Sequence, residues 1–344
     1  MARLAQPVGR WTLAAGLALA WTVLAGPARG AESAPVGRPD PPGTATEVRL
    51  GIFVMDVASI DDATQTFGAD FFLIQRWRDP RLAFDVASGS EAVRALPADE
   101  VWTPEVQILN RRALQTALPE RVLVSPDGTV LYRQRYQGSL ASPLDLRQFP
   151  FDRQQLWIRV ASLHEADQVV LQPDPQRIGR MPRFSIAGWT LELGPLESDT
   201  FEPIAGERVL PRAALLLAAR REVGYFVWKL FVPLALIVFM AWTVFFIGHD
   251  QMGPRIGIST ASIFTLIAFQ FSLGRVLPPI SYLTRADQFV LGSSVLVYLA
   301  LAETIFSGKL KIGGKSELAQ RMDRHARWIY ATLFVVVAAL TLGG

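Results

Sequence analysis

The sequence of 344 residues contains no cysteine and only three histidines. Without a thiol the chain forms no disulfide and offers no thiolate to a metal or to redox chemistry. His164, His249 and His325 lie far apart and lack the spacing of a metal-ligand motif. Acidic and basic residues are nearly balanced, at 31 and 34, so charge gives no reason to expect a nucleic-acid partner. We therefore expect no metal site, no cofactor and no nucleic acid.

Sequence motifs of catalytic sites are also missing. The chain has no Walker loop, no G-x-S-x-G turn and no H-E-x-x-H pair, which would mark a nucleotide hydrolase, a serine hydrolase or a zinc protease. These absences argue against an enzyme. Half of the residues are hydrophobic, which is high for a soluble protein and low for one embedded entirely in a membrane. The length suggests about two domains.

Residues 1–30 have the features of a secretory signal peptide. Arg3 and Arg10 precede an apolar core, and Ala28-Arg29-Gly30 is an acceptable cleavage site. The core is short for a membrane span, so cleavage is favoured over an uncleaved anchor helix. Residues 31–46 are rich in proline, glycine and small polar residues, and we expect a flexible leader there.

Residues 47–222 carry the signals of a β-rich domain. Short β-prone runs are separated by turn residues, and Asp127-Gly128 is a hairpin signal between two of them. Apolar and polar residues alternate through the segment LWIRVA at 156–161, as expected of a half-buried strand. The simplest fold is an all-β, immunoglobulin-like sandwich of about ten strands.

Residues 223–344 contain four apolar segments, each close to the roughly 20 residues that a helix needs to cross a membrane. We expect a four-helix transmembrane bundle. The connector 309–326 is basic, which places it in the cytoplasm and the β domain outside. A secretory signal leads to the same orientation, that of a multi-pass membrane protein with its β domain outside. The four expected helices cover about 223–248, 254–277, 287–308 and 327–343.

The second apolar segment has one face of small residues. At about 100° per residue, Gly257, Ala261, Ala268, Ser272 and Arg275 share a narrow face, on which Phe264 is the one large side chain. Such a face can pack tightly against another helix, or it can surround water. The residues of this segment leave both alternatives open.

Five motifs follow one another along the chain from about residue 47 to the end, and together they resemble a known family. It is that of the prokaryotic pentameric ligand-gated ion channels, relatives of the Cys-loop receptors. The motifs are Trp77-x-Asp79 with Arg81-Leu82, Trp102-Thr103-Pro104-Glu105, Phe149-Pro150-Phe151-Asp152 with Gln154-Gln155, Arg221 with Tyr225 and Pro233, and Leu277-Pro278 with Ser281-Tyr282-Leu283-Thr284.

Two departures separate the chain from the neurotransmitter receptors. Ser142 and Leu156 stand where the receptors have the two bridged cysteines, as in the prokaryotic branch. Leu109 and Leu163 stand where two aromatic walls of the agonist site are expected. A cage for a cationic amine needs aromatic faces, so an amine agonist is disfavoured.

The resemblance still places a ligand site on the β domain. Arginines near it, including Arg135 and Arg212, suit an anionic ligand, although they fit solvated surface charges equally well. Exposed aromatic residues on strands can likewise be packing residues. The candidates for the ligand site, besides Leu109 and Leu163, are Phe72, Tyr132, Arg133, Tyr136 and Arg208.

The resemblance implies that five identical subunits surround a pore lined by the second membrane helix. It also implies a multi-pass protein of the bacterial inner membrane with its β domain in the periplasm. The implied pore-facing residues are Gly257, Ala261, Phe264, Ala268, Ser272 and Arg275. A ring of Phe264 side chains would form a hydrophobic gate. Pro254 and Arg255 at the inner mouth slightly favour anions, and Asp250 offers the cation-selective alternative.

Coupling between the two domains is expected at their junction. A buried arginine needs carboxylate partners, and for Arg221 we expect Asp152, Asp61 and Asp62. The other residues expected in coupling are Phe149, Pro150, Phe151, Pro278 and Tyr282. The function implied is a channel opened by a small ligand or by protons; a membrane-anchored sensor or adaptor that does not conduct is the alternative.

Overall fold

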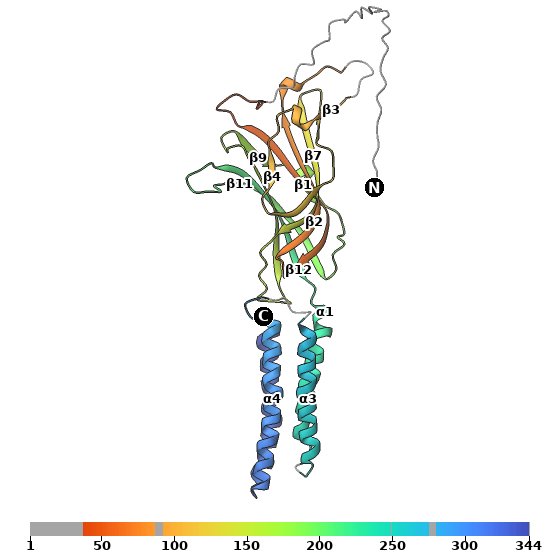
Figure 1. Cartoon of the computed structure of the whole chain (residues 1–344), viewed down its shortest axis with the longest axis vertical. Helices are drawn as coiled ribbons and strands as arrows, with labels where there is room; N and C mark the ends of the chain where they lie inside the picture. Colours follow the sequence, from red (N-terminus) through yellow and green to blue (C-terminus); the bar gives the residue numbers. More distant parts are fainter. Residues whose placement is uncertain (1–36, 87–91, 249, 275–279, 344) are drawn as a thin grey trace, which may run out of the picture. The chain divides into compact units, whose positions relative to one another are not determined.

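The structure is a computed structural model that describes residues 37–86, 92–248, 250–274 and 280–343. Strands occupy the first part of the described chain and long helices the last part (Figure 1). The predicted signal peptide lies outside the described residues, and so does the leader as far as residue 36. Four further residues named above, His249, Arg275, Leu277 and Pro278, also lie outside them.

The strands form two sheets, one of eight strands and one of four, within the described residues. This confirms the predicted β-sandwich, with two strands more than the expected ten. The larger sheet has the order β10 (Gly179–Arg180), β1 (Thr46–Asp61), β2 (Thr66–Arg78), β7 (Thr129–Ala141), β6 (Arg121–Val124) and β3 (Arg94–Pro97), with β5 (Arg111–Thr116) on β7 and β9 (Val169–Pro173) on β1. The smaller sheet has the order β11 (Trp189–Phe201), β12 (Leu210–Arg221), β8 (Arg153–Ser162) and β4 (Val106–Ile108).

The core of the β domain follows from the alternation of side chains along the strands. Leu156, Ile158 and Val160 of β8 are fully buried, whereas Arg153 and Gln155 on the other face are exposed. Burying one such aliphatic side chain stabilises the fold by about 1.5–3 kcal/mol. The register of each strand is therefore fixed, since a shift by one residue would expose this whole set.

The turn predicted at Asp127-Gly128 joins β6 to β7. Gly128 has a φ of 79°, a conformation that glycine adopts without steric cost. Asp127 accepts hydrogen bonds from the backbone amide and the hydroxyl of Thr129. The two strands then pair antiparallel, with Val124 opposite Val130, which confirms the predicted hairpin.

Four helical spans are long and apolar enough to cross a membrane. The first, Gly224–Phe246, combines α1 (Gly224–Phe226), a π-helical turn at Val227–Phe231, α2 (Val232–Thr243) and a final turn at Val244–Phe246. Pro233 explains the π-helical turn, because proline lacks an amide hydrogen and clashes with the carbonyl four residues earlier. The other spans are α3 (Met252–Leu273), α4 (Arg285–Ile312) and α5 (Ser316–Leu342).

The last two helices are longer than predicted, and the connector between them is shorter. The predicted connector covers 309–326, but only residues 313–315 separate α4 from α5. The basic residues of this region continue the helices beyond their apolar parts. Straight-chain residues such as lysine and arginine favour helix, and apolar content alone does not reveal where such a helix ends.

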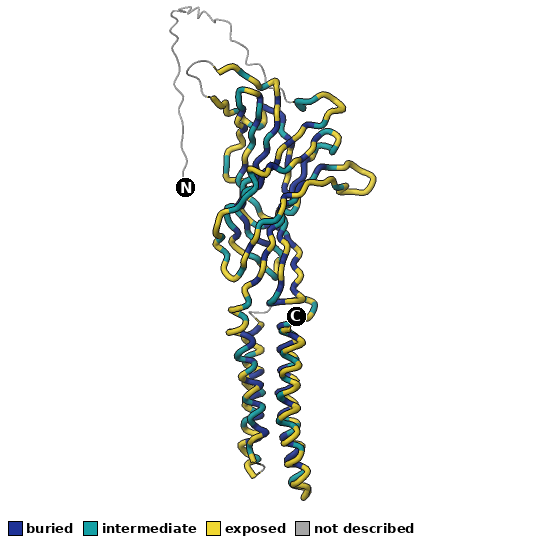
Figure 2. The backbone as a smooth tube through the Cα atoms, turned by 180° about the vertical axis from the view of Figure 1, so that it is seen from behind, coloured by how far each residue is buried: buried dark blue, intermediate teal, exposed yellow. Residues whose placement is uncertain are grey.

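Within the described helices α4 packs against the other three. Small residues allow close approach, since a side chain at Gly292 of α4 would collide with Val337 of α5. The outward faces of the helices remain exposed in the single chain (Figure 2). Large apolar side chains, such as Leu236, Phe271 and Leu340, lie on these faces, which therefore suit lipid or neighbouring subunits.

Candidate functional site

The helix α3 has one packed face and one open face. Ser259, Ser262 and Leu266 are buried against the rest of the bundle, and the Ser259 hydroxyl lies 3.4 Å from that of Thr304 on α4. The five described residues that we expect to line a pore are all exposed on the opposite face. They are Gly257, Ala261, Phe264, Ala268 and Ser272.

Phe264 is the largest side chain among these five, with 67% of its surface exposed. Its neighbours on the same face are alanines one turn away in each direction, so the ring projects beyond them. Thr265 and Ser272 direct their hydroxyls to backbone carbonyls of their own helix. The open face is therefore weakly polar between its small residues, and Phe264 is the one aromatic ring among the five expected pore residues; Phe271, two turns later, is exposed on the same side.

The inner end of α3 differs from the prediction for Arg255. This side chain does not share the open face, because it is fully buried and its Nη1 lies 3.0 Å from a carboxylate oxygen of Asp323 on α5. Glu303 of α4 lies 3.5 Å from the same guanidinium. The prediction that Arg255 supplies an open positive ring at a pore mouth is wrong for this conformation, because its charge is neutralised inside the bundle.

Pro254 and Asp250 are both exposed at this end of the helix. The Asp250 carboxylate accepts a hydrogen bond of 2.7 Å from Lys311 of α4, yet 97% of its side-chain surface remains open. Asp250 is therefore an accessible negative group at the start of α3.

A cluster of charges centred on Arg221 lies where β12 ends and the first span begins. Its guanidinium donates to Asp152 over 2.8 Å and to both carboxylate oxygens of Asp62 over 2.9 Å. The ring of Trp189 covers it, with the guanidinium carbon 4.2 Å from the ring centroid. Burial is the largest influence on Asp62 and raises the pKa of its carboxyl, against the opposite effect of Arg221.

Asp61 is not a partner of Arg221, and the prediction that it would be one is wrong. Its carboxylate instead accepts hydrogen bonds from the backbone amides of Ala63 and Thr64 in the turn between β1 and β2. These bonds lower the pKa of Asp61. The structure thus brings Arg221 together with two of its three predicted partners, and the third caps the turn.

The loop before β8 contacts the helical region at several points. The hydroxyl of Tyr282 accepts a hydrogen bond of 3.0 Å from the backbone amide of Leu146. Phe149 packs edge-on against Phe226, with ring centroids 4.9 Å apart, and Phe151 stacks on Phe231. The Phe149–Pro150 peptide bond is cis. The described residues that we expect in coupling therefore form one contact region, apart from Asp61.

The predicted ligand residues do not form one cluster. Tyr132, Tyr136 and Leu163 line a small hollow of about 260 Å³, together with Gln75 and Glu105. Burial raises the pKa of Tyr136 to about 12, so its phenol stays protonated at neutral pH. The residues around the hollow carry three hydroxyls, two amides and one carboxylate.

Phe72 and Arg133 lie on the other face of the same sheet, where the guanidinium carbon is 5.6 Å from the ring centroid. Leu109 is exposed away from the hollow, and Arg208 lies 3.2 Å from Glu165. Arg135 is paired with Asp70 and Arg212 with Asp199. These last three arginines therefore already have carboxylate partners within the chain.

Two parts of the chain match models of known protein families. Residues 34–192 match the neurotransmitter-gated ion-channel ligand binding domain, and residues 230–311 match the neurotransmitter-gated ion-channel transmembrane region. The chain belongs to this family. Among channel relatives, it is 27% identical over 300 residues to a proton-gated ion channel of Gloeobacter violaceus, covering 86% of this chain and 83% of the relative. It is 26% identical over 283 residues to gamma-aminobutyric acid receptor subunit beta-4 of Gallus gallus, covering 80% of this chain and 58% of the relative.

As a member of the pentameric ligand-gated channels, the chain is a multi-pass membrane protein of a family of channels and not of enzymes. The matched transmembrane region includes α3 and its open face. The buried cluster of Arg255, Glu303 and Asp323 is a feature of this channel protein that the sequence motifs do not reveal. The sequence does contain one indication that Arg255 is buried. Arg255 precedes Phe264 by nine residues, or about two and a half helical turns, and therefore lies on the opposite face of the helix.

Proposed function

We propose that five copies of this chain form a ligand-gated ion channel whose pore is lined by the open face of α3. The observation that carries the proposal is the contrast between the two faces of this helix. One face is packed against the chain's own bundle, and the other exposes Gly257, Ala261, Phe264, Ala268 and Ser272. Five such faces around a central axis would enclose a narrow channel wall of small residues.

Phe264 is the proposed gate. Five phenyl rings at one level would make the narrowest and least polar part of the wall, and such a ring stops ions when water leaves it. Its high exposure in the single chain supports this role, since its own bundle leaves 67% of the side chain open.

The proposed orientation places the β domain in the periplasm and the α4–α5 connection in the cytoplasm. The end of α4, the connection and the start of α5 carry Lys309, Lys311, Lys315, Arg321 and Arg324. Positive residues are retained on the cytoplasmic side of bacterial membranes. The apolar outer faces of the helices support a place in the inner membrane, and the predicted signal peptide agrees with export of the β domain.

The burial of Arg255 changes the balance between anions and cations. The sequence slightly favours anions because of this residue, but its charge is paired with Asp323 and directed away from the open face. Asp250 is the accessible charge near the start of α3. We therefore propose cation conduction, with Asp250 contributing the negative potential at the inner mouth.

The trigger acts on the β domain and reaches the pore through the contacts around Arg221. A proton is one candidate, favoured by the raised pKa of the partly buried Asp62 and by the name of the bacterial relative, a proton-gated ion channel. A small ligand in the hollow beside Tyr132 and Tyr136 is the second candidate, supported by that hollow's polar lining.

The test is electrical recording from the full-length protein expressed in oocytes. Steps to acidic external pH, and then a screen of small ligands, should evoke a current. Its reversal potential should follow sodium and not chloride when each is replaced in turn. A reversal potential that follows chloride would refute cation selectivity. Correctly assembled pentamers that pass no current under any trigger would favour the alternative, a sensor or adaptor that does not conduct.

A further inference from the structure

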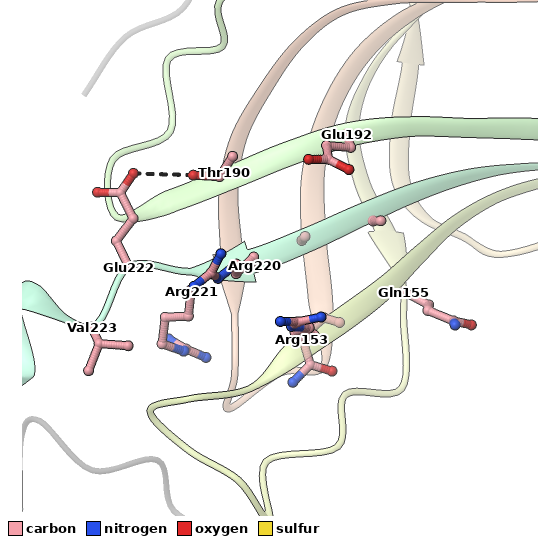
Figure 3. A pocket seen from close by; sticks show the side chains of 11 residues that line it. Arg153, Gln155, Thr190, Glu192, Arg220, Arg221, Glu222 and Val223 are labelled. Atoms are coloured by element: carbon pink, nitrogen blue, oxygen red, sulfur yellow. Dashed lines mark hydrogen bonds between the residues drawn. The ribbon is translucent and has the colours of Figure 1, made fainter. Parts of the chain in front are cut away.

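A hollow of about 720 Å³ lies on the outer face of the smaller sheet, close to the end of β12 (Figure 3). Neither the proposed pore residues nor the candidate ligand residues belong to it. Three strands supply its central residues, which are polar or charged except for one alanine. They are Arg153, Gln155, Thr190, Glu192, Ala218 and Arg220.

Strand pairing brings two arginines together in this hollow. Arg153 of β8 is directly opposite Arg220 of β12, and Thr190 of β11 is opposite Arg220 on the other side. The next row along the strands has Ala218 between Gln155 and Glu192. Because the side chain of Ala218 at the centre of that row is only a methyl group, the surface has a depression beside the two guanidinium groups.

The two arginines face outward because side chains alternate along a strand. Arg153 and Arg220 are exposed, whereas their neighbours Gln154 and Arg221 are buried on the other face. Figure 3 shows the Arg220 and Arg221 side chains leaving β12 in different directions. Arg221 and Gln154 also border the hollow, but the guanidinium of Arg221 is buried with Asp62 and Asp152. The exposed pair of Arg153 and Arg220 is therefore separate from that buried cluster.

The pair of arginines lacks a carboxylate partner among the described residues. Like charges directly opposite each other on neighbouring strands repel. Within that part of the chain, no ion pair or hydrogen bond is formed by the guanidinium of Arg153 or Arg220, whereas those of Arg135 and Arg212 are paired with aspartates. Glu222, at the rim, accepts from the Thr190 hydroxyl at 3.4 Å.

We propose that this hollow binds a small oxyanion, a carboxylate or a phosphate group, between Arg153 and Arg220. Each guanidinium presents a planar set of N–H donors that matches two oxygens of such a group. An oxyanion removes the repulsion between the two arginines, and the amide of Gln155 offers a further donor. The methyl group of Ala218 leaves room for the rest of the ligand.

Two sources could supply this chemistry. One is a free carboxylate or phosphate compound in the solution around the β domain. The other is the phosphate of a lipid headgroup, because Arg220 precedes the first membrane span at Gly224 by only four residues, or about 13 Å of extended chain. In both cases the bound anion lies beside Arg221, which is the next residue in the sequence.

The test is anion binding to the full-length pentamer in detergent at constant ionic strength. Acetate is followed by saturation-transfer NMR, inorganic phosphate by its ³¹P line width, and phosphatidylglycerol by native mass spectrometry. We expect Arg153→Gln and Arg220→Gln each to weaken binding by about tenfold or more. Binding of acetate and phosphate identifies the free compound as the source, and binding of phosphatidylglycerol alone identifies the headgroup.

Two further variants make the test specific. Arg121→Gln removes an exposed arginine from β6 of the other sheet and should bind as the unchanged protein does. Ala218→Leu keeps both arginines and fills the depression, so it should weaken binding without changing the charge. Equal binding by all variants, or no binding of any of the three probes to the unchanged protein, overturns the proposal. None of these measurements depends on ion conduction, so they are independent of the proposed channel function.

Discussion

Arg255 of α3 and Asp323 of α5 form an ion pair inside the helical bundle, with 3.0 Å between Nη1 and Oδ2 and neither side chain more than 5% exposed. Ser307 of α4 donates to the same carboxylate over 3.1 Å. Three membrane helices are thus held together by one buried charged group. A buried ion pair of this kind is costly to break, because the remaining charge is left in a medium that solvates it poorly.

The first prediction concerns this pair. Asp323→Ala should lower the thermal denaturation midpoint of the purified protein strongly, since removing one partner of a buried pair costs about 3–5 kcal/mol. Arg321→Ala, close by on α5 and exposed, is the matched control and should change the midpoint little. Fluorescence-detected size-exclusion chromatography after heating measures both. Equal midpoints for the two variants would contradict the structural role of the pair.

The second prediction concerns the gate. Phe264→Ala removes the protruding ring and should increase the current that flows without a trigger, because a wider and wetter constriction no longer excludes ions. The control is Phe306→Ala on α4, which removes an equally large exposed ring from outside the proposed pore. Patch recording of resting current decides the matter. A resting current unchanged by Phe264→Ala would remove Phe264 from the gate.

The sequence and the structure agree on α3 for a physical reason. A helix has a fixed angular repeat, so the sequence alone places Gly257, Ala261 and Phe264 on one side. The same repeat places Arg255 opposite Phe264, so its charge points into the bundle and not toward the proposed pore. Its partner Asp323 could not be predicted, because it lies on another helix whose rotation depends on packing.

At the domain junction, too, the sequence predicts some of the contacts and only the structure reveals the others. The sequence predicts that Arg221 needs carboxylates, and Asp62 and Asp152 meet that need because a buried guanidinium without a counter-charge is unstable. Asp61 cannot be distinguished from Asp62 by sequence. The two differ only through the turn, in which Asp61 is positioned to accept from Ala63 and Thr64.

The third prediction concerns Arg221 itself. Arg221→Ala leaves Asp62 and Asp152 close together without a counter-charge, so either assembly or triggered current should be lost. Arg221→Lys keeps the charge but cannot bond both carboxylates in the same planar geometry, and should reduce the current while preserving more of the assembly. Surface labelling measures the amount of protein that reaches the membrane, so that a loss of assembly can be distinguished from a loss of current. A dose–response curve unchanged in Arg221→Ala would rule out the coupling role.

The fourth prediction concerns pH. Burial raises the pKa of Asp62 above its ordinary value, so as pH falls this carboxyl takes up a proton earlier than an unfolded aspartate does. Between the two pKa values the folded state binds more protons than the unfolded state, so lowering the pH through this range increases the stability of the folded form. Protonation also weakens the attraction of Asp62 to Arg221, and this is the step that an acidic trigger would use.

Asp62→Asn should therefore flatten the dependence of current on external pH in the range between the ordinary pKa of an aspartate and the raised pKa of Asp62. The matched control is Asp127→Asn, because Asp127 lies in an exposed turn where the amide and hydroxyl of Thr129 lower its pKa. That carboxylate stays ionised until the pH is well below the range in which Asp62 titrates, so its removal should leave the pH response of the current in place. Current recorded at a series of pH values from each variant compares them directly. A pH response that survives in Asp62→Asn with an unchanged midpoint would show that the proton acts elsewhere.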